Sequence, residues 1–221
     1  MGPALEADRL YRFYYAGADA ETLALCGVSL VIEPGEMVAV NGPSGSGKST
    51  LLACLAGLDE PDGGMVRVAG QVMSRRPEQE RAKLRARAIG MLFQSANLVE
   101  HLTVDQNLAL AQRLARRPDA PSRTSLLGDL GLTDRRHARP SELSGGEAAR
   151  AGLAVALAND PPVVLADEPT GEVDGGAESR LLALLRARAA AGGAVVVVTH
   201  SPKVAGEADR TIHLLDGQVV P

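Results

Sequence analysis

The sequence is poor in the residues that mark several classes of protein. It has no Trp, and aromatic residues make up only 2% of the chain. Its two cysteines, Cys26 and Cys54, do not have the spacing of metal ligands. We therefore expect neither a disulfide nor a redox pair, and we interpret both cysteines as small apolar residues buried in a core.

Long apolar runs and an excess of positive charge are also missing. No window of about eighteen uncharged apolar residues occurs, so we expect no membrane-spanning helix. The net charge of −4 argues against bulk binding of nucleic acid. The N-terminal segment MGPALEADRL contains acidic side chains and no apolar signal core, which predicts that the chain stays in the cytoplasm.

Among the features that are present, the segment Gly42–Thr50 has the most specific pattern. It reads Gly, four residues, Gly-Lys and Ser, and it lies between the apolar runs Met37–Val40 and Leu51–Leu58. Between a strand and a helix, such glycines let backbone N–H groups converge on phosphate oxygens, and the helix start adds positive potential. Lys48 can then reach the β- and γ-phosphates, and Ser49 can bind Mg²⁺. The alternative is a Gly- and Ser-rich surface turn, which accounts for neither flank.

All nine residues of this loop are candidate contacts for a nucleotide: Gly42, Pro43, Ser44, Gly45, Ser46, Gly47, Lys48, Ser49 and Thr50.

Apolar periodicity and turn residues predict strands that alternate with helices. Strands are expected at Leu10–Tyr15, Leu23–Ile32, Met37–Val40, Met65–Val68, Ile89–Phe93, Val163–Leu165 and Val195–Val198. Helices are expected at Leu51–Gly57, Arg75–Arg87, Glu147–Asn159 and Glu178–Ala191, with further turns of helix within Asn97–Arg117 and Leu126–Leu132. Thr103 is a candidate N-cap. Residues from about 95 to 158 lack strand patterns, so we expect a helical insert in an α/β domain with a parallel sheet.

Polar residues gather where the predicted strands end. Asp167 and Glu168 follow Val163–Leu165. In a P-loop fold, an Asp in this place orients Mg²⁺, and the next Glu can polarise the water that attacks the γ-phosphate. The alternative is a pair of capping acids before a Pro turn, which the presence of the phosphate loop disfavours.

Two further residues end strands on the same predicted edge. Gln94 follows Ile89–Phe93, and an amide there can contact Mg²⁺ or the attacking water, although an isolated Gln is more often a plain loop residue. His200 follows Val195–Val198 and can contact the γ-phosphate, although a lone His is usually structural.

A second anion site is predicted at Ser144, Gly145 and Gly146, which precede a helix. Ser144 and Glu147 also have the spacing of a capping box, and the two interpretations are compatible. A nucleotide on Gly42–Thr50 can use this second site only if another copy or a partner supplies it.

Four of the five aromatic residues lie in the segment Tyr11–Tyr15. They can pack on a sheet edge, or one of them can stack on an adenine base, because an aromatic face suits any base.

Together these segments resemble the ATP-binding cassette (ABC) ATPases from Leu10 to about Gly217, nearly the whole chain. Gly42–Thr50 resembles the Walker A motif, Gln94 the Q-loop, and Leu143–Glu147 the signature. Val163–Glu168 resembles the Walker B motif. Gly171–Asp174 resembles the D-loop, His200 the switch histidine, and Tyr14 by its position the adenine-stacking residue, with Tyr15 and Tyr11 as alternatives. The resemblance implies a P-loop NTPase with a mostly parallel sheet core, an N-terminal antiparallel β part and a helical insert, in a single domain over residues 1–221.

The motif details are most similar to the lipoprotein-release, macrolide-export and cell-division group. Departures from the family pattern are Glu147 in place of the usual Gln, Ala148 and Ala149 in place of polar residues, Val155 in place of Arg, and Glu172-Val173 before Asp174. None of these departures removes a residue expected to contact phosphate, Mg²⁺ or the attacking water. They do leave open how tightly the dimer forms, and whether it is a homodimer or a heterodimer with a second ABC ATPase.

The resemblance implies a subunit that binds and hydrolyses ATP with Mg²⁺. Two such ATPases would sandwich two ATP molecules and drive a separate membrane permease, docked near Gln94–Thr103, from the cytoplasmic face of the membrane. An alternative is an ATPase module that signals through a membrane partner to an extracytoplasmic enzyme without transport. A role on DNA or ribosomes is disfavoured, because a second cassette, a long coiled coil and a basic face are absent from the sequence.

Overall fold

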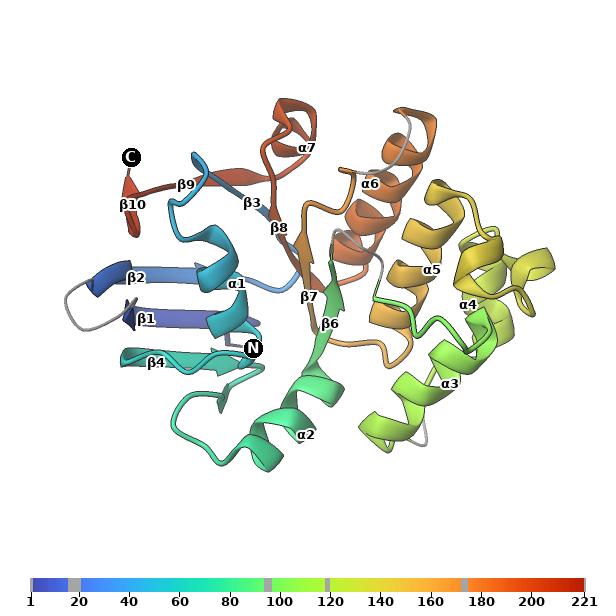
Figure 1. Cartoon of the computed structure of the whole chain (residues 1–221), viewed down its shortest axis with the longest axis horizontal. Helices are drawn as coiled ribbons and strands as arrows, with labels where there is room; N and C mark the ends of the chain where they lie inside the picture. The colour runs from blue at the N-terminus through green and yellow to red at the C-terminus, as the bar shows by residue number, and fades with distance from the viewer. Residues whose placement is uncertain (1, 16–20, 94–96, 118–119, 172–174, 221) are drawn as a thin grey trace.

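The computed structural model describes residues 2–15, 21–93, 97–117, 120–171 and 175–220. Its strands form a four-stranded antiparallel sheet and a six-stranded, mostly parallel core sheet (Figure 1). The antiparallel sheet has the order β2-β1-β4-β5, with β1 Leu5–Tyr15, β2 Glu21–Ile32, β4 Gly63–Val68 and β5 Gln71–Val72. The core sheet has the order β10-β9-β3-β8-β7-β6, with β3 Met37–Asn41, β6 Ile89–Leu92, β7 Val163–Asp167, β8 Ala194–Val198, β9 Arg210–Leu215 and β10 Gln218–Val220.

The core strands are parallel except for β10, which pairs with β9 in the antiparallel sense. Strands β3, β7 and β8 are adjacent, so their carboxyl ends meet at one edge of the sheet. This arrangement brings together segments more than a hundred residues apart in sequence, and it fixes where the functional side chains gather.

Both faces of the core sheet are covered by apolar side chains. Val163 and Leu165 point into one core, shared with the antiparallel sheet, whereas Val164 and Ala166 point into a second core, shared with the helices. A strand buried on both faces needs a continuous apolar run, which is why β7 and β8 lack polar alternation.

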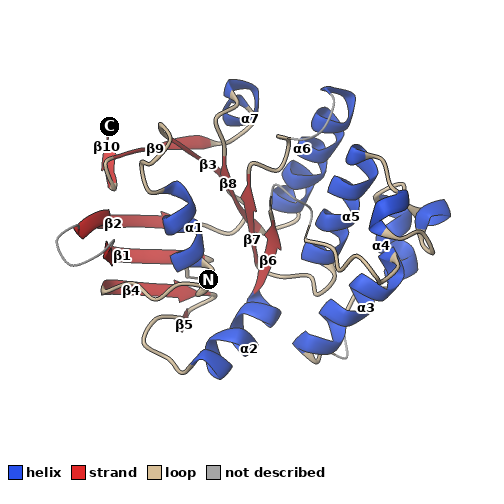
Figure 2. Ribbon diagram, in the orientation of Figure 1, coloured by secondary structure: helices blue, strands red, loops and turns tan. Residues whose placement is uncertain are grey.

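The described helices pack against the core sheet, and several of them lie beyond it on one side (Figure 2). They are α1 Lys48–Leu55, α2 Glu78–Ala88, α3 Val104–Ala115, α4 Arg123–Asp129, α5 Gly145–Leu157, α6 Gly175–Ala190 and α7 Pro202–Gly206, with short 3₁₀ turns at Thr133–Arg135 and Pro140–Glu142. Helix α1 lies between the two sheets, whereas α3, α4 and α5 gather on the far side of the core sheet (Figure 1). Within the described ranges, no helix is both long enough and apolar enough to cross a membrane.

The predicted fold class is confirmed. Thr103 caps α3 as predicted, in a complete capping box with Gln106. Helix α1 begins at Lys48, before the apolar run Leu51–Gly57 from which the helix was predicted. The prediction that Cys26 is buried is wrong: it is only half-buried, and its Sγ accepts a hydrogen bond from Gln218 Nε2 at 3.4 Å, whereas Cys54 is buried as expected.

Candidate functional site

A cavity of about 730 Å³ opens at the carboxyl edge of the core sheet. It gathers ten of the residues predicted from the sequence: Tyr14, Ser44, Gly45, Gly47, Lys48, Ser49, Thr50, Asp167, Glu168 and His200. They come from the end of β1, the loop between β3 and α1 together with the first residues of α1, the end of β7, and the residues after β7 and β8. Residues from four separated segments therefore face one space, as a nucleotide site requires.

The loop before α1 depends on two glycines where the backbone passes close to a neighbour. A Cβ on Gly42 would lie 2.1 Å from the carbonyl oxygen of Leu214, and one on Gly47 would lie 2.3 Å from that of Ala24. Gly47 also adopts φ 99°, which favours glycine. No side chain caps the start of α1, so its first backbone N–H groups are available to an anion in the cavity.

Lys48 is the cation of this loop. The side chain is 7% exposed, and Nζ donates hydrogen bonds to the carbonyl oxygens of Gly42 at 2.9 Å and Pro43 at 2.8 Å. Burial lowers the pKa of Lys48, while the charges of Glu168 and Asp167 oppose that shift. The three charges therefore lie close enough to interact across the cavity.

Asp167 ends β7, and its surroundings favour a cation. Burial raises the pKa of Asp167, while the charge of Lys48 and a hydrogen bond from Ser49 oppose that shift. The carboxylate and the Ser49 hydroxyl thus form a pair of hard oxygen donors beside the phosphate loop.

Glu168 is held from three sides. Its backbone N–H donates a hydrogen bond to the carbonyl oxygen of Val198 at 2.9 Å. The backbone of Glu168 has a φ of 43°, a left-handed conformation that is uncommon outside glycine. Its Oε2 accepts a hydrogen bond from Thr199 Oγ1 at 3.3 Å, and His200 Nε2 lies 3.7 Å from Oε1. Oε1 itself is buried and has no hydrogen-bond partner in the described part of the chain, so one acceptor of this carboxylate is left unsatisfied.

Tyr14 is the one described aromatic residue of the Tyr11–Tyr15 segment whose side chain lines this cavity. Tyr11 lies instead against Gly27 and Gly63, and the side chain of Tyr15 lies outside the described parts of the structure. Of the described side chains, the geometry therefore favours Tyr14 for contact with a base.

Other predicted residues lie elsewhere. Ser144 and Gly145 are exposed at the start of α5 and do not line the cavity, and neither does Gly146. Ser144 and Glu147 form the predicted capping box, with Ser144 N donating to Glu147 Oε2 at 2.8 Å. Gly42, Pro43 and Ser46 belong to the loop but do not line the cavity. Gln94 and the end of Gly171–Asp174 lie outside the described residues.

Sequence reasoning missed several residues of the site. Thr199, which holds Glu168, was visible as the polar residue next to His200 at the end of an apolar strand. Asp216 and the β2 residues Thr22 and Ala24 also line the cavity, but they reach it from the turn after β9 and from the antiparallel sheet. No local pattern in the sequence indicates that approach.

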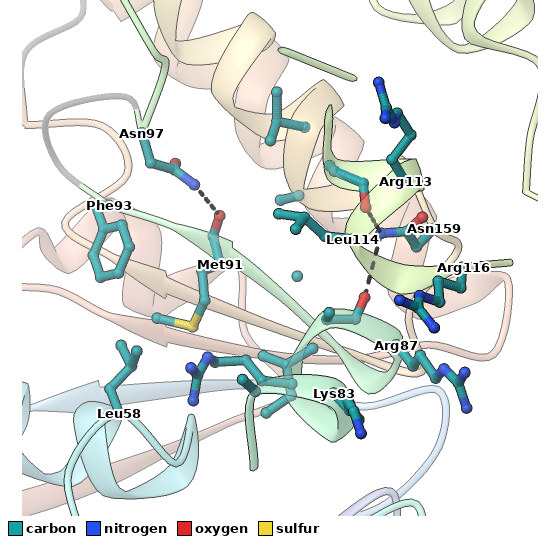
Figure 3. Close-up of a pocket in the computed structure, with 18 residues that line it drawn as sticks. Leu58, Lys83, Arg87, Met91, Phe93, Asn97, Arg113, Leu114, Arg116 and Asn159 are labelled. Atoms are coloured by element: carbon teal, nitrogen blue, oxygen red, sulfur yellow. Dashed lines mark hydrogen bonds between the residues drawn. The ribbon is translucent and has the colours of Figure 1, made fainter. Parts of the chain in front are cut away.

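A second cavity of about 790 Å³ lies between α2, β6, α3 and α5, away from the phosphate loop. Figure 3 shows Lys83, Arg87, Arg113 and Arg116 at one end of it, and Leu58, Phe93 and Asn97 at the other. Leu114, which also lines it, is 65% exposed. In the described part of the chain, Lys83, Arg113 and Arg116 form no ion pair, so this cavity combines apolar walls with unpaired positive charge.

The fold and the first cavity define a P-loop nucleoside triphosphate-binding protein. Comparison with known proteins narrows the class: the family model described as ABC transporter matches residues 25–171, more than half of the chain. The chain belongs to the ABC transporter family, and it is an ATP-binding cassette that hydrolyses ATP.

Individual relatives agree with this assignment. The Macrolide export ATP-binding/permease protein MacB of Hyphomonas neptunium is 42% identical over 99% of this chain, and that of Shigella flexneri is 43% identical over 100%. The chain spans about a third, 34%, of the length of these relatives. Among solved structures, a dimeric post-hydrolysis state of the ATP-binding cassette MJ0796 bound to ADP and Pi has a TM-score of 0.89 and 34% identity, covering 98% of this chain and 97% of that one.

Proposed function

We propose that this cassette drives the membrane permease part of an exporter by Mg²⁺-dependent ATP hydrolysis in a dimer with shared sites. The observation that carries the proposal is the gathering of Lys48, Ser49, Asp167, Glu168 and His200 around one cavity. The names of the relatives, which join macrolide export with a permease, support export over signalling without transport. That the permease is a separate chain stays a prediction.

The residues at the cavity suit Mg²⁺. Ser49 and Asp167 offer a hydroxyl and a carboxylate, and Mg²⁺ in nucleotide sites is held by one or two such oxygens together with phosphate oxygens and water. Among the described residues no cluster of three or more His, Cys, Asp or Glu side chains forms, which fits a metal brought with the nucleotide. When bound, Mg²⁺ would neutralise charge on the β- and γ-phosphates.

The remaining steps belong to side chains of this chain. Lys48 and the N–H groups at the start of α1 bind the phosphates, and Tyr14 stacks on adenine. Glu168 accepts the hydrogen bond of the attacking water and takes its proton as the water oxygen adds to the γ-phosphorus; the bond from the γ-phosphorus to the oxygen that bridges it to the β-phosphate breaks, so ADP and phosphate are the products. His200, beside the same carboxylate, contacts the γ-phosphate, and Gln94 is proposed to touch Mg²⁺ or the water.

A second copy, or a second ABC ATPase, completes each site. Ser144 and Gly145 are exposed at the start of α5 and lie outside the cavity of their own chain. A nucleotide that Lys48 holds in the cavity would therefore meet Ser144 and Gly145 only if another chain supplied them across an interface. Dimeric structures are known for the related cassette MJ0796. We propose that the signature segment Ser144–Gly146 contacts the nucleotide on the opposite protomer.

The membrane part is proposed to dock at the second cavity, on the side of the helical region that includes Asn97. We propose that residues about 95–158 form a helical subdomain of one domain; between β6 and β7 the described residues contain helices and turns but no strand. Among the described residues Lys83, Arg113 and Arg116 form no ion pair, and with exposed Leu114 they suit a cytoplasmic segment that has acidic and apolar side chains. This arrangement would place the chain at the cytoplasmic face of the membrane.

The proposal is tested by phosphate release from ATP in titrations of Mg²⁺. The wild-type chain should release phosphate with Mg²⁺ and not with excess chelator, and Asp167→Asn should need at least about tenfold more Mg²⁺ for half-maximal rate. Asp129→Asn, an exposed Asp far from the cavity, is the matched control and should behave as wild type. An Asp167→Asn protein with an unchanged Mg²⁺ requirement would remove Asp167 from the metal site.

A further inference from the structure

The ring of Tyr14 is held by an ionic cluster outside the cavity. Its hydroxyl donates a hydrogen bond to Asp59 Oδ2 at 2.7 Å, and the guanidinium of Arg12 lies 4.7 Å from the ring centroid. Arg12 Nε also donates to Asp59 Oδ2 at 2.8 Å, and Arg12 Nη1 donates to Asp62 Oδ2 at 3.0 Å. The ring therefore has its edge fixed by one carboxylate and one of its faces covered by a cation.

Tyr14 lines the nucleotide cavity and Arg12 does not. Because the guanidinium of Arg12 covers one face of the ring, a base that stacks on Tyr14 would use the other face. The stack would then run from guanidinium to phenol to base, and the cation would keep the ring from turning when the base leaves.

Asp59 is itself fixed to the helix that binds the phosphates. Its backbone N–H donates to Ala53 O in α1 at 3.2 Å, and its Oδ1 accepts from the backbone N–H of Glu60 at 2.9 Å. Helix α1 has eight residues and is thus about 12 Å long. Its first residue is Lys48, so one short helix links the phosphate loop to the carboxylate that holds the aromatic ring.

The charges agree with a permanently ionised carboxylate. Burial alone would raise the pKa of Asp59, but hydrogen bonds from Tyr14 and Arg12 and the charge of Arg12 bring it below its ordinary value. Burial and the hydrogen bond to Asp59 raise the pKa of Tyr14, so the phenol remains a donor. The bond between them is therefore charge-assisted throughout the neutral pH range.

We propose that Asp59 is a positioning residue for nucleotide binding: together with Arg12 it holds the Tyr14 ring at a fixed place relative to the phosphate loop. The proposal rests on the proposed function, in which Tyr14 stacks on adenine. It predicts that Asp59 affects the affinity for the base part of ATP and leaves the phosphate contacts and the chemical step unchanged.

The experiment compares two ligands on the full chain, ATP and inorganic tripolyphosphate, which lacks a base. Asp59→Ala should weaken ATP binding about tenfold, because a charge-assisted hydrogen bond and a stacking partner are lost together. It should raise KM for ATP with kcat unchanged and leave tripolyphosphate binding unchanged. In a Tyr14→Ala background, Asp59→Ala should have no further effect on ATP affinity, because the two residues act through one ring.

Two further variants keep the test decisive. Asp8→Ala, on the same strand as Tyr14 but exposed, is the matched control and should bind both ligands as wild type. If Asp59→Ala does not fold, Tyr14→Phe decides, because it removes only the hydroxyl that Asp59 holds; it should weaken ATP several-fold and leave tripolyphosphate binding unchanged.

Three results would overturn the proposal. Asp59→Ala, or in its place Tyr14→Phe, could bind ATP as tightly as wild type, or it could lose ATP and tripolyphosphate equally, which would indicate general damage to the fold. An unchanged ATP affinity in Tyr14→Ala would remove the base platform and the positioning role with it. Failure of the proposed function is distinct, because it would appear as a wild-type chain that does not hydrolyse ATP with Mg²⁺.

Discussion

Glu168 is the residue on which the chemistry depends most. Its left-handed backbone and its bond to Thr199 leave Oε1 buried and without a partner in the described part of the chain. A buried acceptor without a donor is unfavourable in a folded protein unless a ligand uses it. We propose that the attacking water is this ligand.

We predict that Glu168→Gln keeps ATP binding and lowers the hydrolysis rate by about 10²–10⁴-fold, because an amide cannot draw off the proton. Single-turnover phosphate release measures the rate, and filter binding of ATP measures affinity. Glu207→Gln, an exposed Glu outside the cavity, serves as the control. Hydrolysis at the wild-type rate in Glu168→Gln would show that another group is the base.

At this scale the sequence predicted residues that the structure brings together at one cavity, but it did not predict the contacts that hold them. Asp167 and Glu168 were visible because they follow an apolar strand near a phosphate loop. The bond from Thr199, by contrast, depends on β8 lying beside β7, and the clamp of Arg12 on Tyr14 depends on the turn after α1. Such contacts arise from tertiary structure, so no local pattern could reveal them.

Helix α5 begins with a capping box that carries an extra charge pair. Arg135 Nε donates to Glu147 Oε1 at 2.8 Å, in addition to the bonds between Glu147 and Ser144. The hydrogen bond from Arg135 and those from Ser144 hold the pKa of Glu147 at about 2. Glu147, a departure from the Gln usual in the family, thus forms the capping box that the sequence predicted and, in addition, an ion pair with Arg135 that the sequence did not predict.

We predict that the Glu147 carboxylate titrates near pH 2, and that Arg135→Gln moves the titration toward the ordinary value of about 4.5. Because the folded pKa is the lower one, the stabilisation by Glu147 is present above about pH 4.5 and is lost as the pH falls through about 2. Side-chain carboxyl NMR measures both proteins. Titration of the wild-type group near 4.5 would contradict the structure at this helix start.

The cavity between α2 and α3 offers a test at the level of elements. We predict that Lys83→Glu with Arg113→Glu weakens attachment to membranes of the native host roughly tenfold, because charge complementarity is reversed, while basal ATP hydrolysis is unchanged. Sedimentation of the chain with the membrane fraction measures attachment, at low and at high salt. Arg180→Glu, exposed on α6, is the control. Equal sedimentation of all three proteins would place the docking surface elsewhere.

The prediction of strands succeeded where burial on both faces requires an apolar sequence, and it failed for two strands that are partly exposed. β3, β7 and β8 are covered on both faces and have continuous apolar runs, so all three were predicted. β9 and β10 were missed, because they lie toward one edge of the sheet and mix exposed polar residues with a few apolar ones.

At the scale of the whole molecule, the two predicted sets of phosphate-binding residues lie apart, because only one of them lines the cavity. The cavity holds Lys48 and Glu168, whereas Ser144 and Gly145 are exposed at the start of α5. In the proposed arrangement, each chain therefore supplies one half of each of two sites. Two chains, placed head to tail, would form two complete sites.

Mixing two inactive proteins tests this sharing. Lys48→Ala breaks the phosphate loop and Ser144→Arg breaks the signature, so each homodimer has two damaged sites. In a mixed dimer both lesions fall in the same site, and the other site is intact. We predict that the mixture hydrolyses ATP faster than either parent protein. A mixture whose hydrolysis rate never exceeds that of its parents would indicate that hydrolysis needs two intact sites in one dimer.

The most direct test of the account is the solution mass of Glu168→Gln protein by light scattering, with and without ATP. With hydrolysis blocked, ATP should convert a species of 22.9 kDa into one of about twice that mass, since each nucleotide joins two chains. Adding Ser144→Arg to the same chain should leave ATP binding intact and prevent the increase. A Glu168→Gln protein that is saturated with ATP and keeps the monomer mass would contradict the shared-site account for two copies of this chain.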